Sequence, residues 1–174
     1  KEKRPNIKKV AVISPNDTSG LDTNTAVVKA AKGLGFDVVA DETYERGTKD
    51  FYPILTKMLA KKPDLLDVAA APPGEAGLIL KQAVELGFKG AKGWTAGVNP
   101  ATLINVAGQE AAEGVWSPVN VNVKSDFVDP KVRKFGEEYE KRYKEVPGVI
   151  AVANYGAFDV FTKAMQEAGS VETE

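Results

Sequence analysis

Cysteine and histidine are both absent from the 174 residues. Their absence excludes disulfide bonds, thiolate chemistry, zinc sites of the usual Cys/His kind and every catalytic triad built on imidazole. It does not fix the compartment, because reduced cytosolic proteins and simple exported proteins can both lack cysteine. Much common enzymology is therefore excluded before any motif is considered.

The chain also lacks a dominant charge and a long apolar run. It has 23 basic and 24 acidic residues and a net charge of -1, so nucleic acid is not expected as a partner. The longest uninterrupted apolar run, residues 149–153, is far shorter than the roughly 18 residues of a membrane span. With 43% apolar residues in a chain of this length, we expect one sizeable globular core.

No cofactor or metal motif is present, and we expect neither group. Gly33 and Gly35 lie at the end of an expected helix, whereas a dinucleotide fingerprint needs its glycines between a strand and the start of a helix. There is no Gly-Lys-Ser/Thr motif, and the Pro-Pro-Gly run at 72–74 lacks the free amides that cradle phosphate. Asp126 and Asp129 form a tempting carboxylate pair, but Asp129 precedes Pro130 in a position typical of a helix cap.

The chain begins at Lys1, with neither an initiator Met nor an apolar signal segment. We therefore expect a processed protein or an excised piece of a longer one. The basic residues that follow are few and have no interleaved aromatics, so they predict a solvated linker over 1–7 that leads into a hinge.

From Ile7 onward, short β-branched runs alternate with helical patterns. This alternation predicts an α/β fold, a three-layer doubly wound parallel sheet over residues 8–116. Strands are expected at 9–13, at 37–40 or slightly longer, at 65–71 and at 91–95, with a fifth extended piece from 114. The helix after the first strand should bury one face, which carries Val27, Ala30, Ala31 and Leu34.

The pattern changes after residue 116. Residues 117–128 contain a proline, alternating Val and Asn and no helical signal, so they are expected to be an extended crossover. Asp129 and Pro130 form a strong helix start. Two helices are expected in 129–174, the second of them, over 150–168, largely apolar.

In doubly wound sheets, ligands bind beyond the carboxyl ends of the strands. The loops at 14–20, 71–74 and 94–99 follow three of these ends. Hydroxyls and helix amides at 16–19 can hold a ligand, although helix capping alone explains such a stretch more often. Trp94 can wall a ligand or belong to the core. The candidate ligand-binding residues are Asp17, Thr18, Ser19, Pro72, Pro73, Trp94 and Thr95.

Several weak motifs occur in a specific order along nearly the whole chain. They are residues 8–13, 50–51, 55–64, 77–87, 107–108 with 112–114, Phe135 with Tyr139 and Tyr143, 155–159 and 168–169. Together they resemble the type I periplasmic solute-binding proteins of ABC transporters, specifically the branched-chain amino-acid (Leu/Ile/Val) binding family. The resemblance implies the second of two lobes, with the helices of 129–174 packing on a first lobe that this chain lacks, or on another copy.

The resemblance also implies where the ligand binds. The family's ligand-facing positions match Thr18 or Ser19 after the first strand, Pro72 after the third and Thr95 after the fourth. Amino-acid binders of the family commonly have a carboxylate in the fourth-strand loop, where Thr95 is neutral. A standard α-amino acid is therefore less expected than a small organic or aromatic acid.

The resemblance implies a function in solute uptake. The chain would capture a small solute in an interlobe cleft and deliver it to an ABC permease, in the periplasm or another extracytoplasmic space. A sensory or regulatory ligand-binding domain of the same fold is an alternative that these residues do not distinguish. A doubly wound enzyme is a second alternative, disfavoured by the absence of histidine, cysteine and cofactor motifs.

Overall fold

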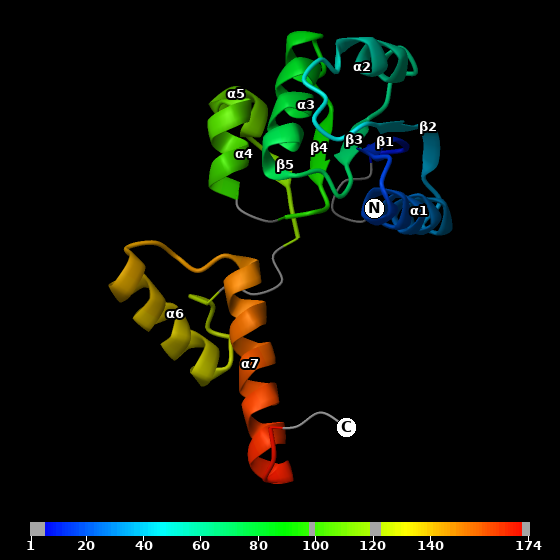
Figure 1. Ribbon diagram of the computed structural model, residues 1–174. Helices are drawn as coiled ribbons and strands as arrows, with labels where there is room; N and C mark the ends of the chain where they lie inside the picture. The colour runs from blue at the N-terminus through cyan, green and yellow to red at the C-terminus, as the bar shows by residue number, and fades with distance from the viewer. Residues whose placement is uncertain (1–5, 98–99, 119–122, 172–174) are drawn as a thin grey trace. The chain divides into compact units, whose positions relative to one another are not determined.

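The computed structural model describes residues 6–97, 100–118 and 123–171 and divides the chain into two compact units, Lys1–Pro118 and Val119–Glu174 (Figure 1). Parts of four expected features lie outside the described residues. These are the linker at 1–5, the fourth-strand loop at 98–99, the crossover at 119–122 and the end of the helical segment at 172–174. Each unit is described by itself below.

The first unit contains a five-stranded parallel sheet in the order β2-β1-β3-β4-β5. Its strands are β1 (Lys9–Pro15), β2 (Asp37–Tyr44), β3 (Leu65–Val68), β4 (Ala91–Trp94) and β5 (Val115–Trp116). The predicted α/β parallel sheet is confirmed. β3 ends three residues earlier than predicted, and just beyond its end Ala70 has a φ of 52°, a left-handed conformation incompatible with a strand.

Helices cover both faces of this sheet. They are α1 (Thr18–Gly33), α2 (Tyr52–Leu59), α3 (Pro73–Glu85), α4 (Pro100–Ala107) and α5 (Gln109–Ala112). The main core lies between the sheet and α2 to α5, and includes the fully buried side chains of Phe51, Leu55 and Ile79. On the opposite face, α1 packs its Val27 and Val28 against Val10 and Val12 of β1.

The buried face of α1 differs from the predicted one. Gly20 and Asn24 are its buried residues, whereas Ala30 is exposed and the side chain of Leu34 is 65% exposed. Leu34 is the C-cap residue of the helix, so its backbone has already left the helical path and no longer follows the helical period. The four-residue face predicted from spacing is therefore wrong at its C-terminal end.

The second unit is a helical pair, α6 (Pro130–Tyr143) and α7 (Val149–Ala168). The rings of Phe135 and Tyr155 stack between them, with centroids 4.3 Å apart. Gly136 of α6 lies against Val123, and a Cβ atom on that glycine would come within 2.7 Å of the Val123 Cβ. The close packing of α6 on the preceding segment thus requires a glycine here.

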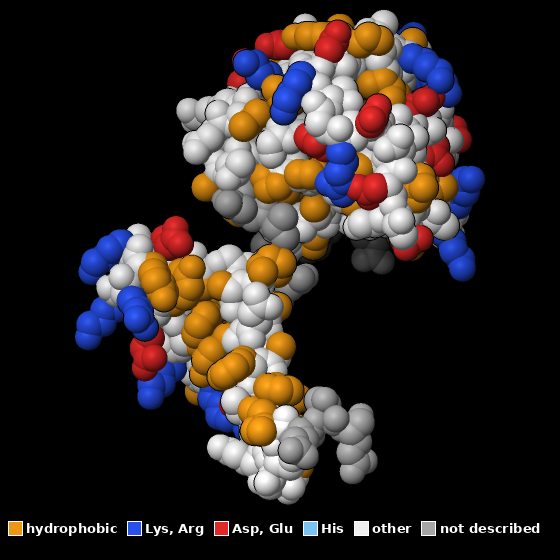
Figure 2. Space-filling model, in the orientation of Figure 1, with side chains coloured by type: hydrophobic (Ala, Val, Ile, Leu, Met, Phe, Trp, Pro, Cys, Tyr) orange, Lys and Arg blue, Asp and Glu red, His pale blue; other side chains and the backbone are white. Residues whose placement is uncertain are grey.

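Much of α7 does not pack within its own unit. Among its large apolar side chains, Ile150, Phe158, Val160 and Phe161 are more than half exposed. Figure 2 shows hydrophobic side chains gathered over the helical pair. Within the described residues, no helix combines the length and the apolar character needed to cross a bilayer.

Candidate functional site

The carboxyl ends of the five strands share one edge of the sheet, because all four strand pairs are parallel. The loops that follow β1, β2, β3 and β4 therefore gather at this edge. Six of the seven sequence-predicted residues lie in these loops or in the first turns of the helices that follow them; Trp94 ends β4. A face built from several loops on a rigid sheet is where doubly wound folds bind ligands.

The first loop is organised by Asp17. This residue is the N-cap of α1, and its Oδ1 accepts a hydrogen bond of 2.8 Å from the amide of Gly20. Its Oδ2 accepts a hydrogen bond from Nε of Arg46 and forms an ion pair with it. The Arg46 hydrogen bond, followed by that of Gly20, lowers the pKa of the Asp17 carboxyl. Asp17 is thus an ionised cap whose charge is balanced by Arg46.

Thr18 and Ser19 form the first turn of α1, and both side chains are exposed. The N-terminus of a helix carries a partial positive charge from its unsatisfied amides. The turn can approach β1 closely only because residue 20 is glycine: a Cβ there would lie 2.0 Å from the carbonyl oxygen of Pro15. The backbone of Thr18 and Ser19 is thereby held at the carboxyl edge of the sheet, with both side chains exposed there.

A second group of residues ties the edge loops together. The hydroxyl of Tyr44 donates to Glu75 Oε2 at 2.7 Å, and the amide of Gly47 donates to Glu75 Oε1 at 2.8 Å. Burial, with the Glu75 hydrogen bond second, raises the pKa of Tyr44, so its hydroxyl stays protonated and donates. The Asn16 amide also donates to the Tyr44 carbonyl at 2.8 Å. The loops after β1, β2 and β3 are therefore held as one body.

Pro72 and Pro73 form the start of α3, as its N-cap and its first residue, and both are half-buried. No side chain caps this helix, and the Ala76 amide bonds to the Pro72 carbonyl at 2.8 Å instead. Proline suits a first helical position because its φ is fixed and it has no amide to satisfy. Both prolines give the edge a rigid apolar surface, and their contact with a ligand stays a prediction.

Trp94 lies in the core. Its side chain is 2% exposed, and its indole Nε1 donates to the Ala71 carbonyl at 2.9 Å. That bond links the end of β4 to the loop after β3. The role of Trp94 as a ligand wall stays a prediction, and the structure gives it a structural role as well.

The Thr95 hydroxyl is hydrogen-bonded to Asp67, an acid that was not among the predicted site residues. Its Oγ1 donates to both carboxylate oxygens of Asp67, at 2.8 and 3.0 Å. Asp67 belongs to β3 and is 8% exposed, and burial raises its pKa, partly opposed by the Thr95 hydrogen bond. The fourth-strand loop is itself neutral, but its Thr95 contacts the buried carboxyl group of Asp67.

Some residues of this edge were not predicted from the sequence, and they differ in how clearly the sequence indicates them. Asp67 stands inside an otherwise apolar run, and a buried acid is rare enough for that placement to be a signal. Tyr44, Arg46 and Glu75 have no such local signal, because they meet only through tertiary structure. No group of three or more acidic side chains that could hold a metal ion occurs among the described residues.

Comparisons with known proteins show which family and which fold the chain resembles. Residues 2–174 match the family model described as periplasmic binding protein. A leucine-, isoleucine-, valine-, threonine- and alanine-binding protein of Pseudomonas aeruginosa is 25% identical over 96% of this chain and 43% of its own length.

Solved structures give the same result. The leucine-binding protein LivK of Thermotoga maritima is similar with a TM-score of 0.88 and 26% identity, over 98% of this chain and 48% of its own. The substrate-binding protein LivJ of Streptococcus pneumoniae, solved with isoleucine, has a TM-score of 0.77 and 26% identity, over 92% and 45%. The chain thus spans about half the length of these relatives.

Proposed function

The chain belongs to the periplasmic binding protein family, and from this membership we propose that it is one lobe, with its return helices, of a solute receptor for an ABC uptake transporter. The receptor captures a small molecule between two lobes outside the cytoplasmic membrane and delivers it to the permease. Relatives named as amino-acid-binding and transporter proteins support this role. Binding and release suffice for it, and no step needs a bond to be made or broken.

The ligand binds at the edge formed by Thr18, Ser19, Pro72 and Thr95. The observation that carries this assignment is the start of α1. Two exposed hydroxyls stand at the positive end of a 16-residue helix, and the only carboxylate of that turn, Asp17, is already paired with Arg46. A carboxylate on the ligand is stabilised there by the two hydroxyls and by the partial positive charge of the helix end, without facing an unpaired negative charge.

The ligand is a small carboxylic acid with an apolar or aromatic body, or an amino-acid-like molecule. Pro72 and Pro73 offer it an apolar surface, and the fourth loop contributes the neutral Thr95. Leucine is the less favoured member of this class, because an ammonium at the edge would have no carboxylate of the fourth-strand loop beside it.

The experiment is isothermal titration of the full-length gene product with leucine, a short aliphatic acid and an aromatic acid. We expect the aromatic acid to bind more tightly than leucine. Ser19→Ala should weaken binding about tenfold, the effect of one hydrogen bond to a charged group. Lys29→Ala, at another exposed position on α1, is the matched control and should change nothing. Tighter binding of leucine would refute this ligand class.

The exposed apolar side chains of α7 are covered by a second protein surface. In the full-length receptor this is the first lobe, which accords with relatives of about twice this length. When residues 1–174 are produced alone, a second copy covers them and the chain dimerises. Sedimentation tests the second statement: a chain that stays monomeric at high concentration would refute it.

A further inference from the structure

A cavity of about 500 Å³ lies in the first unit, on the face of the sheet to which α1 packs. Its apolar walls include Phe36, Leu65, Ala91 and Trp116. It reaches Trp94 and Thr95 but none of the residues at the start of α1 or α3. Its volume is in the range of small-molecule sites, which is roughly 300–1,000 Å³.

The polar centre of this cavity is Asp67. The side chain is more than nine-tenths buried and is the only ionisable group among the described lining residues. In the described part of the chain, the hydrogen bonds to its two oxygens both come from the Thr95 hydroxyl. A carboxylate can accept about four hydrogen bonds, so this single hydroxyl leaves most of its capacity unused.

The sheet accommodates this carboxylate because position 93 is glycine. Gly93 of β4 is paired with Asp67 in the strand register, and a Cβ atom there would lie 2.7 Å from Asp67 Oδ1. The carboxylate therefore packs against the backbone of Gly93, and a residue with a side chain would press on it. A buried carboxylate with spare acceptor capacity calls for a cation or another hydrogen-bond donor, because an unpaired buried charge is costly.

We propose that this cavity binds a compact primary amine with an apolar or aromatic body. Its ammonium pairs with the Asp67 carboxylate, and its body packs between Phe36, Leu65 and Trp116. An ammonium offers three donors to the unused lone pairs of the acid, and a charge-assisted hydrogen bond is about twice as strong as a neutral one. Aromatic walls favour such a body and add an attractive surface for a cation.

The two tryptophans of the chain allow a direct test. Trp94 and Trp116 are the only two, and both line the cavity, so intrinsic fluorescence reports its occupancy. The 174-residue chain is titrated with 2-phenylethylamine, which is cationic at pH 7, and with its neutral isostere 2-phenylethanol. We expect saturable binding, with the amine favoured about tenfold or more, the magnitude of a hydrogen bond to a charged group.

Substitutions distinguish the effect of the Asp67 charge on probe affinity from the effect of the cavity volume. Asp67→Asn should abolish the preference for the amine, because it removes the charge with which the ammonium pairs. Asp67→Ser, a second neutral replacement of the acid, should have the same effect, which covers the case in which D67N does not fold. Ala91→Leu fills the cavity and should weaken both probes.

Five results would overturn the proposal: no saturable binding, equal binding of the two probes, an amine preference that survives in folded D67N, affinities unchanged in A91L, or equal binding of an anionic apolar dye. The last would show that the face binds apolar molecules without regard to their charge. The test uses only the first unit's own cavity, so its failure is distinguishable from failure of the proposed uptake function.

Discussion

Gly20→Ala tests the packing that fixes the start of α1. An added Cβ would lie 2.0 Å from the carbonyl oxygen and 2.8 Å from the carbonyl carbon of Pro15. Normal carbon–oxygen contacts are about 3.3 Å or longer, so the first turn of α1 must move away from β1. Overpacking of this severity costs about 3 kcal/mol. Alanine is favoured over glycine in a helix by about 1 kcal/mol, which leaves a net destabilisation of about 2 kcal/mol.

The matched control is Gly33→Ala in the last turn of the same helix. Beyond its chain neighbours and its own helix backbone, no atom lies within 4 Å of the Cβ that this substitution would add, so only the helix preference applies and a gain of up to about 1 kcal/mol is expected. Stability is measured by urea unfolding followed through tryptophan fluorescence, since both tryptophans belong to the first unit. G20A should lower the midpoint by about 1 M. If G20A is as stable as G33A, the packing argument fails.

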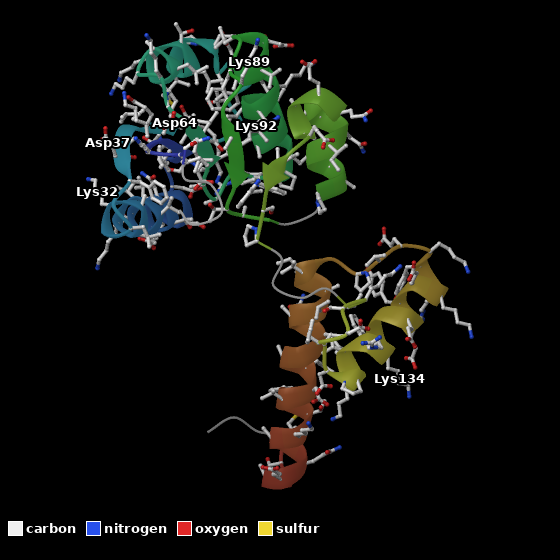
Figure 3. The ribbon with its side chains drawn as sticks, turned by 180° about the vertical axis from the view of Figure 1, so that it is seen from behind. Lys32, Asp37, Asp64, Lys89, Lys92 and Lys134 are labelled. Carbon is white, nitrogen blue, oxygen red and sulfur yellow. The ribbon has the colours of Figure 1, made fainter. Side chains whose placement is uncertain are left out.

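Three further substitutions test other parts of the lobe. Gln82→Leu removes the side chain that accepts from the Phe51 amide at 2.7 Å and donates to the Lys49 carbonyl at 2.8 Å. The buried Phe51 amide is left unpaired, so urea unfolding should show the free energy of unfolding lowered by about 1–3 kcal/mol. An unchanged midpoint would contradict this. Asp64→Ala should lower the urea midpoint, because the Asp64 carboxylate (Figure 3) accepts from two backbone amides at 2.8 and 2.9 Å, whereas equal midpoints would make these bonds dispensable. Asp67 has a raised pKa in the folded protein, so its contribution to stability is full below the unfolded pKa of about 3.8 and declines as pH rises through the folded pKa. The difference in unfolding free energy between Asp67→Asn and the natural protein should therefore shift in favour of D67N from pH 4 to pH 8. Parallel curves of stability against pH would refute the raised pKa.

Local patterns in the sequence predict the helix ends well. The Leu-Gly-Phe triplets at 34–36 and 86–88 predict two identical helix stops, and both are confirmed. Gly35 and Gly87 have φ values of 74° and 85°. In each stop the glycine amide bonds to a carbonyl three residues back and the following Phe amide to one five residues back, the Schellman arrangement. Three adjacent residues carry the whole signal, so no tertiary information is needed.

Features that depend on tertiary contact are not predictable in this way. β2 is predicted at 37–40 or slightly longer, and it extends to Tyr44 because its second half pairs along β1. The Tyr44–Glu75 and Arg46–Asp17 pairs join residues about 30 positions apart, 31 and 29 respectively. The Thr95–Asp67 bond spans 28 positions in the same way. Periodicity places each residue on an element but does not show which elements are neighbours.

The seven candidate residues illustrate the same limit at the site. The sequence places them correctly at the carboxyl ends of strands, because the strand positions and the parallel arrangement follow from local pattern. It does not show that Asp17 is neutralised by Arg46 or that Trp94 is 2% exposed. Both facts decide what these side chains can offer a ligand, and both arise from packing between distant segments.

The measurement that tests the proposed uptake function most directly is a native mass spectrum of the full-length gene product, recorded after incubation with the panel of small acids. The account predicts one retained small molecule per protein, lost on denaturation and reduced in Ser19→Ala but not in Lys29→Ala. A spectrum in which no acid is retained, or in which an acid returns chemically altered, would contradict a receptor that binds and releases its solute unchanged.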